Sequence, residues 1–204
     1  MKTDGLNIGR ASTAILIAGV VLLVCLASAT AAELRFIEVD RDKDHYSLRS
    51  VSWFDSDIES VYAVLTDYEL FHRFTSAIVE SRNLELDARG RPGYYTRMEG
   101  CVLFWCQSFV RRGHLELDPM RQIEAIADPE QSDFRIAREK WQLREEGGGT
   151  LMIYEFEMVP DFWVPPVIGP YYMKRALKSG GEKAVDRIEA LAIATQATRA
   201  AQTP

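Results

Sequence analysis

The sequence predicts a single α+β domain in which a run of antiparallel strands precedes a C-terminal helix. Two observations support this class. Over residues 77–159, turn-forming residues recur about every ten to fifteen positions, which is typical of hairpin-connected strands rather than of βαβ units. Near the C-terminus, Ala184, Ile188, Leu191 and Thr195 recur at helical spacing and define one face of a helix.

A hairpin and two short helices are expected before this run of strands. Residues 34–39 and 45–52 alternate in polarity on either side of a charged turn, which predicts the hairpin. The apolar period then becomes helical over about 57–67, and a shorter helix is expected near 69–75.

Glycines mark two positions in the elements that follow. Residues 147–149 are a triple glycine followed by a strand-like run, so they predict a hairpin turn and not a phosphate loop. Ser179-Gly180-Gly181 either breaks the terminal helix or lets it approach another surface closely. Residues 196–204 are polar and are expected to form a frayed tail.

The first 32 residues have the three-part layout of a secretory signal peptide. Basic residues precede an apolar run over 14–27, and small residues suited to signal peptidase follow. Cleavage before Ala32 or Glu33 would release a domain over 33–195, with its tail, to the periplasm or the medium. An uncleaved membrane anchor is the alternative, and a lipoprotein signal at Cys25 is a weaker one.

Charge and cysteine content restrict the partners and the compartment. The net charge is −6 and no basic cluster is present, which argues against a nucleic-acid partner. Cys25 lies in the leader, so Cys101 and Cys106 remain in the mature chain. Their spacing suits the two strands of a short hairpin, and export favours a disulfide between them. Two buried free thiols are the alternative.

Three segments carry a resemblance to a known superfamily. They are SDIESVYAVLTDYELFHRFTSAI (56–78), SDFRIAREKWQL (132–143) and PPVIGPYYMKRALKSGGEKAVDRIEAL (165–191). With the strand pattern, they make the chain resemble the START-like (SRPBCC) superfamily over nearly all of residues 45–192, and within it the polyketide cyclase/dehydrase and coenzyme Q-binding group. Members often have Pro between the two aromatic residues of the second helix, where this chain has His72.

This resemblance implies a helix-grip fold of the α+β class. A curved antiparallel sheet of about six or seven strands would wrap around the long C-terminal helix, with two short helices after the first strand. It also implies an apolar cavity between sheet and helix that holds a lipid, quinone or polyketide-like molecule. Some members of the superfamily are cyclases, and many have no demonstrated reaction.

The motif content favours binding over catalysis. The sequence has no nucleophile elbow, zinc-protease motif, C-x-x-C pair or Walker loop. His45, His72 and His114 fall in separate predicted elements, so neither a metal nor another cofactor is expected. The sequence does not specify an oligomeric state.

Strand alternation selects the side chains that would face the interior. The predicted cavity residues are Thr96, Met98, Phe109, Arg111, Glu139, Trp141, Met152, Tyr154, Phe156 and Met158. The same parity places Leu117 inward. Methionine and aromatic side chains of this kind either fill a core or line a pocket that adapts to flexible apolar ligands.

Arg111 and Glu139 are the ionisable residues of this inward set. Burial of either is costly unless it is paired, so they would anchor a ligand headgroup, form a structural ion pair, or face solvent through a strand bulge. The expected function is an exported binding or carrier protein for a hydrophobic small molecule. The alternative is a cyclase/dehydrase-type enzyme that uses Arg111, Glu139 or Tyr154.

A stiff aromatic segment joins the last strand to the terminal helix. Prolines limit its conformations, and its apolar residues Phe162, Trp163, Val167 and Ile168 are expected at the cavity mouth. The same residues could plug the end of the sheet without any ligand, or contact a bilayer transiently during ligand exchange.

Overall fold

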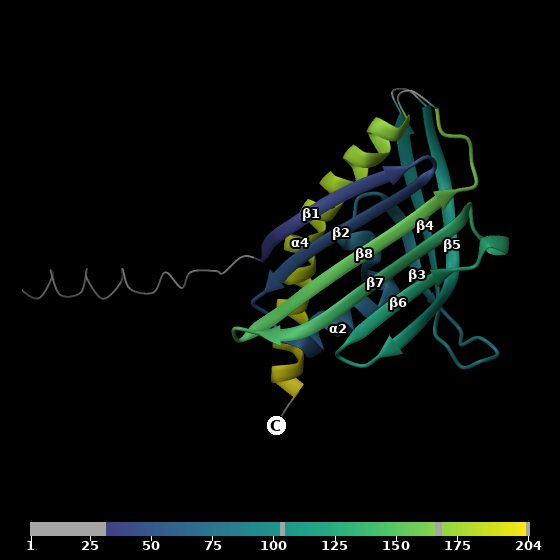
Figure 1. Cartoon of the computed structure of the whole chain (residues 1–204). Coiled ribbons are helices and arrows are strands. Elements are labelled where there is room, and N and C mark those ends of the chain that lie inside the picture. The colour runs from purple at the N-terminus through teal and green to yellow at the C-terminus, as the bar shows by residue number, and fades with distance from the viewer. Residues whose placement is uncertain (1–31, 103–104, 166–168, 203–204) are drawn as a thin grey trace, which may run out of the picture. The chain divides into compact units, whose positions relative to one another are not determined.

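The computed structural model describes residues 32–102, 105–165 and 169–202. These residues form one antiparallel sheet with the order β1-β2-β8-β7-β6-β5-β4-β3 (Figure 1). The strands are β1 (Glu33–Asp42), β2 (His45–Phe54), β3 (Ile78–Leu84), β4 (Gly93–Val102), β5 (Trp105–Asp118), β6 (Gln122–Ala127), β7 (Phe134–Glu146) and β8 (Gly149–Pro160). The helices are α2 (Ile58–Thr66), η1 (Tyr68–Leu70), α3 (Phe71–Phe74), η2 (Pro129–Gln131) and α4 (Gly169–Gln202).

The predicted α+β class is confirmed, with two differences in detail. The sheet has eight strands instead of six or seven, because both strands of the N-terminal hairpin join it. For the same reason the short helices follow the second strand, not the first. The sheet curves so that α4 passes along one of its faces (Figure 1).

The pairing of β2 with β8 joins distant parts of the chain. Tyr46 lies opposite Met158, and the register continues without a break to Phe54 opposite Thr150. The β7–β8 hairpin beside it turns through Gly147 and Gly148, whose φ angles of 63° and 89° favour glycine. The predicted turn at the triple glycine is therefore confirmed.

Two apolar clusters lie between the sheet and the helices. The helix cluster combines residues of α2, α3 and the second half of α4 with the sheet, and includes Val61, Phe71 and Ile188. The buried members of the strand cluster all come from β1, β2, β6, β7 and β8. Met98 and Tyr154 are partly buried and pack against both clusters. Among the described residues, the members of the two clusters run from Ala32 to Ala192.

The second half of α4 is tied to the segment that precedes α2. Ser56 Oγ donates a hydrogen bond to the buried carboxylate of Glu189 at 3.1 Å, and burial raises the pKa of that carboxyl group. Asp57 caps α2 by accepting from the Ser60 backbone N–H at 2.7 Å, and it also pairs with Arg199 at 2.7 Å. The predicted frayed tail is wrong in part, because α4 continues to Gln202.

The first half of α4 is held less firmly. No residue between Tyr171 and Ala184 is buried. The helix is continuous through Gly180 and Gly181, and a Cβ atom at Gly181 would lie 2.9 Å from Ile37 Cδ1. Of the two expectations for this site, close approach is therefore the one observed. No helix within the described ranges is long and apolar enough to cross a bilayer.

Candidate functional site

Arg111 of β5 and Glu139 of β7 point into the interior and form a buried ion pair. Their exposed fractions are 2% and 7%, and Arg111 Nη1 lies 3.1 Å from Glu139 Oε1. Tyr154 Oη donates to the same carboxylate oxygen at 2.9 Å. Arg111 Nε donates to Thr96 Oγ1 at 3.4 Å. The solvent-facing alternative for the ion pair is therefore wrong.

Strand register explains why these side chains meet. Thr96 lies opposite Arg111 in the β4–β5 pair, and Tyr154 lies opposite Trp141 in the β7–β8 pair. Glu139 is two residues from Trp141 on the same strand, so it shares the inward face. The ion pair thus links two strands that are not neighbours, since β6 lies between them.

Electrostatics keep the guanidinium charged and the phenols neutral. Burial alone would lower the pKa of Arg111. The nearby Glu139 carboxylate raises it, and the net shift is upward. Burial, and then the charge of Glu139, raise the pKa of Tyr154 well above its usual range. The same two causes raise the pKa of Tyr68. Both tyrosines therefore keep their hydroxyl protons near neutral pH.

Two polar atoms of this cluster have no partner within the described residues. They are Glu139 Oε2, an acceptor, and Tyr68 Oη, a donor and acceptor, and both are buried. Such atoms are rare in folded proteins, because an unmade buried hydrogen bond costs about 1–3 kcal/mol. We call Thr96, Tyr68, Arg111, Glu139 and Tyr154 the polar cluster.

Apolar and aromatic side chains surround the polar cluster. The Tyr68 ring stacks on Phe71 at 3.8 Å and on Tyr94 at 4.5 Å between ring centroids. Trp141 lies 5.3 Å from Tyr154, measured in the same way. The low polarity of this environment strengthens every hydrogen bond that the cluster makes.

The structure places most of the predicted cavity residues in or beside this interior. Those that are buried are Thr96, Arg111, Glu139, Trp141, Met152, Phe156 and Met158. Met98, Phe109 and Tyr154 are partly buried and belong to the rims of the clusters. Leu117 is an exception, because it stands 39% exposed at the end of β5, where the strand runs into a turn.

Sequence reasoning missed the aromatic part of the site. Tyr68, Phe71 and Phe74 recur every third residue, a signal that was present in the short second helical segment. Tyr94 shares strand parity with Thr96 and could have been found by extending that face by one step.

Phe162, which follows β8, covers one end of the interior. Phe162 stacks on Phe109 with ring centroids 3.9 Å apart and meets Phe134 edge-on at 5.6 Å. Trp163 is 62% exposed. Val167 and Ile168, also predicted for this mouth, lie outside the described residues.

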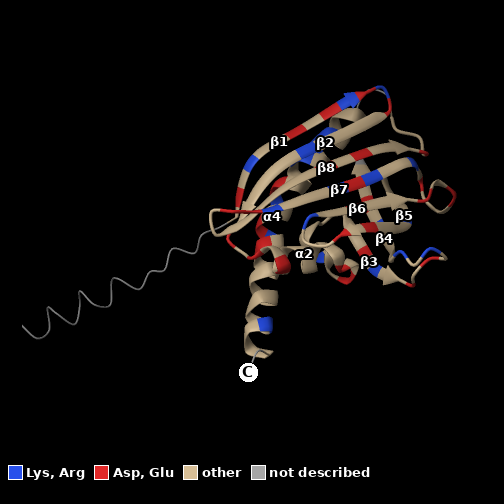
Figure 2. Cartoon of the chain, turned by 60° about the horizontal axis from the view of Figure 1, so that its bottom comes forward, with Lys and Arg blue, Asp and Glu red and all other residues tan. Residues whose placement is uncertain are grey.

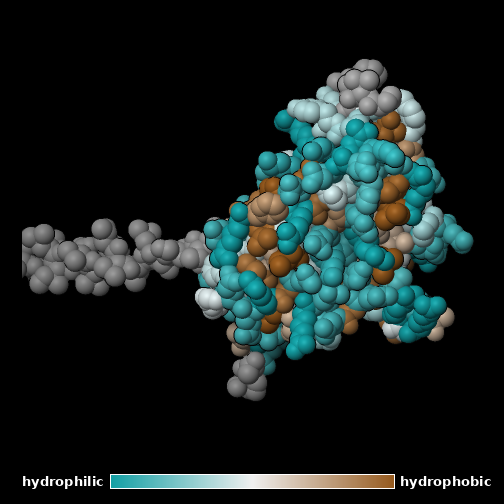
Figure 3. All heavy atoms as spheres, in the orientation of Figure 1, coloured by the Kyte–Doolittle hydropathy of each residue, from teal (hydrophilic) through white to brown (hydrophobic). Residues whose placement is uncertain are grey.

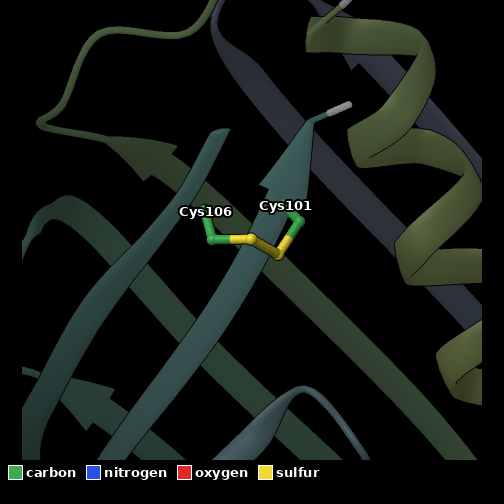
Figure 4. Close-up of a disulfide and its surroundings, with 2 residues drawn as sticks. All are labelled: Cys101 and Cys106. Atoms are coloured by element: carbon green, nitrogen blue, oxygen red, sulfur yellow. A yellow bond between two sulfur atoms is a disulfide. The ribbon is translucent and has the colours of Figure 1, made fainter. Parts of the chain in front are cut away.

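Cys101 and Cys106 lie directly opposite each other on β4 and β5. Their sulfur atoms are 2.03 Å apart, which is bonding distance (Figure 4). Both residues are exposed, so the alternative of two buried thiols does not fit this structure.

Other parts of the surface offer less for a ligand. A hollow of about 510 Å³ lies on the outer side of the sheet, where acidic and basic residues alternate across the strands (Figure 2). Its charges pair across strands, as Arg49 does with Glu155 at 3.4 Å and Arg138 with Glu124 at 3.2 Å. The described residues contain no group of three or more His, Cys, Asp or Glu side chains placed to hold a metal ion.

Comparison with known proteins identifies the family. The family model described as polyketide cyclase / dehydrase and lipid transport matches residues 55–170. The chain belongs to this family. A comparison with curated proteins found no match.

Solved structures share the fold at low sequence identity. A protein from Thermus thermophilus is 14% identical with a TM-score of 0.56, covering 72% of this chain and 97% of its own. A START superfamily protein from Mycobacterium smegmatis is 18% identical with a TM-score of 0.54, covering 71% and 94%. The di-domain ARO/CYC StfQ of the steffimycin biosynthetic pathway is 9% identical with a TM-score of 0.54, covering 76% and 53%. Fold and family are thus consistent with a domain that binds hydrophobic small molecules.

Proposed function

We propose that this protein binds and carries a hydrophobic small molecule that has a neutral oxygen-bearing group, such as a carbonyl or hydroxyl. The observation that carries the proposal is the polar cluster, where Tyr68 Oη and Glu139 Oε2 are buried without partners among the described residues. A ligand oxygen there would accept from Tyr68, and a ligand hydroxyl would donate to Glu139. Quinones, polyketide-like compounds and neutral lipids have this chemistry.

Charge balance supports a neutral group over an ionic headgroup. The Arg111 guanidinium is already compensated by Glu139 at 3.1 Å, so the pair has little net charge to offer. A carboxylate or phosphate brought next to it would be desolvated without full compensation, which is costly in a buried site. A carbonyl or hydroxyl avoids that cost.

The ligand would enter between the first half of α4 and the sheet. Met173 and Leu177 of α4 pack only partly buried against the strand cluster, beside Phe162. Met173 is flexible, and this half of the helix has few fixed contacts to break. A small outward movement of α4 would therefore open a path to the polar cluster.

The test uses Tyr68→Phe, because its hydroxyl has no partner to lose among the described residues. We expect the variant to unfold at a urea concentration equal to or above that of the wild type. Its affinity for decylubiquinone, measured by displacement of a fluorescent lipid probe, should fall about two- to tenfold if one hydrogen bond is lost. Tyr62→Phe on α2 is the control, since Tyr62 lies outside the polar cluster. Equal affinity in both variants, or no binding of any apolar ligand by the wild type, would contradict the proposal.

An enzymatic function of the cyclase/dehydrase type is the second candidate. The observation in its favour is that Glu139 contacts both Arg111 and Tyr154, so an acid–base group and a cation lie together in a buried site. Such an enzyme would release a ligand changed in mass by loss of water. A carrier would release it unchanged, and mass spectrometry of the released ligand separates the two functions.

The leader and the cysteine pair support export as part of the same proposal. An exported protein meets its ligand outside the cytoplasm, where a hydrophobic molecule needs shielding from water. An oxidising compartment would also preserve a disulfide between Cys101 and Cys106.

A further inference from the structure

We propose that the first half of α4, together with Trp163 after β8, docks on an anionic lipid bilayer. The proposal concerns the outer surface and does not depend on what the interior binds. It rests on a helical face that combines cations with an exposed aromatic ring, next to an exposed tryptophan.

The exposed face of α4 is cationic at this end. Tyr171 precedes Lys174 and Arg175 by three and four residues, and Lys178 follows them by four and three, so the four residues share one side of the helix. All four are exposed, whereas Met173 and Leu177 face the strand cluster. The helix is thus amphipathic here, with its polar side turned away from the protein.

Within the described part of the chain, no acidic side chain forms an ion pair with the three cations. The nearest acids along the chain are Asp161 and Glu182. Over residues 162–181 the three cations are the only charged residues, although the whole chain has a net charge of −6. The helix macrodipole favours acids at an N-terminal end, so helix stability does not explain this arrangement.

Two large aromatic side chains border these cations. Trp163 is 62% exposed and Tyr171 is 63% exposed. The segment that carries Trp163 is fixed to the start of α4 by a hydrogen bond from Gly169 N to Pro165 O at 2.9 Å. Tryptophan and tyrosine prefer the membrane interface, and lysine and arginine prefer anionic headgroups. An acidic protein surface would satisfy the cations but would leave the exposed indole without a matching apolar layer.

The proposed docking surface lies beside the end of the interior that Phe162 covers. The face seen in Figure 3 is mainly hydrophilic, with apolar residues in small separate groups. Phe162, next to Trp163, packs on Phe109 at the end of the interior. A bilayer docked on Trp163 would therefore face that same end.

The test measures co-sedimentation of residues 32–204, which include every described core residue, with lipid vesicles. We expect binding to phosphatidylcholine vesicles with about one third phosphatidylglycerol, weaker binding to phosphatidylcholine alone, and release by salt. Each cation contributes about fivefold to the partition coefficient, so K174Q/R175Q/K178Q should lower it about a hundredfold. The matched control R89Q/R112Q/R121Q removes three other exposed cations and should leave it nearly unchanged.

A second pair of variants tests the aromatic residues. W163A/Y171A should weaken binding to both kinds of vesicle, whereas L86A/I193A, which truncates two other exposed apolar residues, should not. All four positions are solvent-exposed, and urea unfolding of each variant checks that it remains folded. If the wild type shows no preference for anionic vesicles, or if the two cation variants bind equally, the proposal is wrong. Binding only to an acidic protein, and not to vesicles, would also overturn it.

Discussion

The buried charges of Arg111 and Glu139 depend on each other. Arg111 Nη1 and Glu139 Oε1 are 3.1 Å apart. Removal of one partner leaves an uncompensated charge in a dry site, whereas removal of both leaves an apolar gap that neighbours can fill.

This contrast gives a prediction that can be measured in a double-mutant cycle. Arg111→Met or Glu139→Leu alone should lower the free energy of unfolding by about 3–5 kcal/mol. The double variant should recover most of that loss and still bind a hydroxyl-bearing ligand about two- to tenfold more weakly than the wild type, because the Glu139 acceptor is gone. Urea unfolding measures the stability, and probe displacement measures the binding. Additive losses in the double variant would mean that the two charges are not coupled.

Residue-level features of the site were only partly accessible from sequence. Parity placed Arg111 and Glu139 inward because side chains alternate strictly along a strand. It could not choose between an ion pair and a solvent-facing bulge, because that choice depends on registers through β6 that no local pattern encodes. The unpartnered hydroxyl of Tyr68 could not be predicted either, since it arises from the way η1 packs on β4.

At the scale of elements, α4 is the part that differs most between its two ends. Its second half is fixed by Val185, Ile188 and Glu189, which are buried, and its first half has no buried residue after Pro170. The sequence predicted the well-packed half correctly from its apolar period. It did not decide between a helix break and a close contact at Gly180 and Gly181, because glycine fits both.

Substitutions at these two glycines should have opposite effects on stability. A Cβ atom at Gly180 would meet nothing within 4 Å, so Gly180→Ala should raise the free energy of unfolding by up to about 1 kcal/mol through helix propensity. Gly181→Leu would press on Ile37 and Leu48 and should lower it by about 1–3 kcal/mol.

Thermal or urea unfolding of the two variants distinguishes them. If both substitutions stabilise the protein, then α4 does not contact β1 and β2 as closely as the structure indicates. In that case the first half of the helix would stand further from the sheet, and the proposed path to the polar cluster would already be open.

At the scale of the whole molecule, the leader and the cysteines make a joint prediction about export. The full chain has three cysteines: Cys25 in the predicted leader, and Cys101 and Cys106 on adjacent strands. Cleavage of the predicted signal peptide would remove the first thiol, and oxidation would remove the other two. The number of free thiols therefore reports both events at once.

We expect protein recovered from the periplasm of an exporting host to begin at Ala32 or Glu33 and to have no free thiol. Alkylation under denaturing conditions without reductant, followed by intact mass measurement, should show no adduct. One adduct on a full-length chain would indicate an uncleaved anchor with the disulfide formed, and two adducts on the cleaved chain would indicate export without oxidation. Because the disulfide closes a small loop, its reduction should lower the free energy of unfolding by only about 2–3 kcal/mol. The eight-stranded sheet and its core would then remain folded in either redox state, so ligand binding by the reduced mature chain should persist.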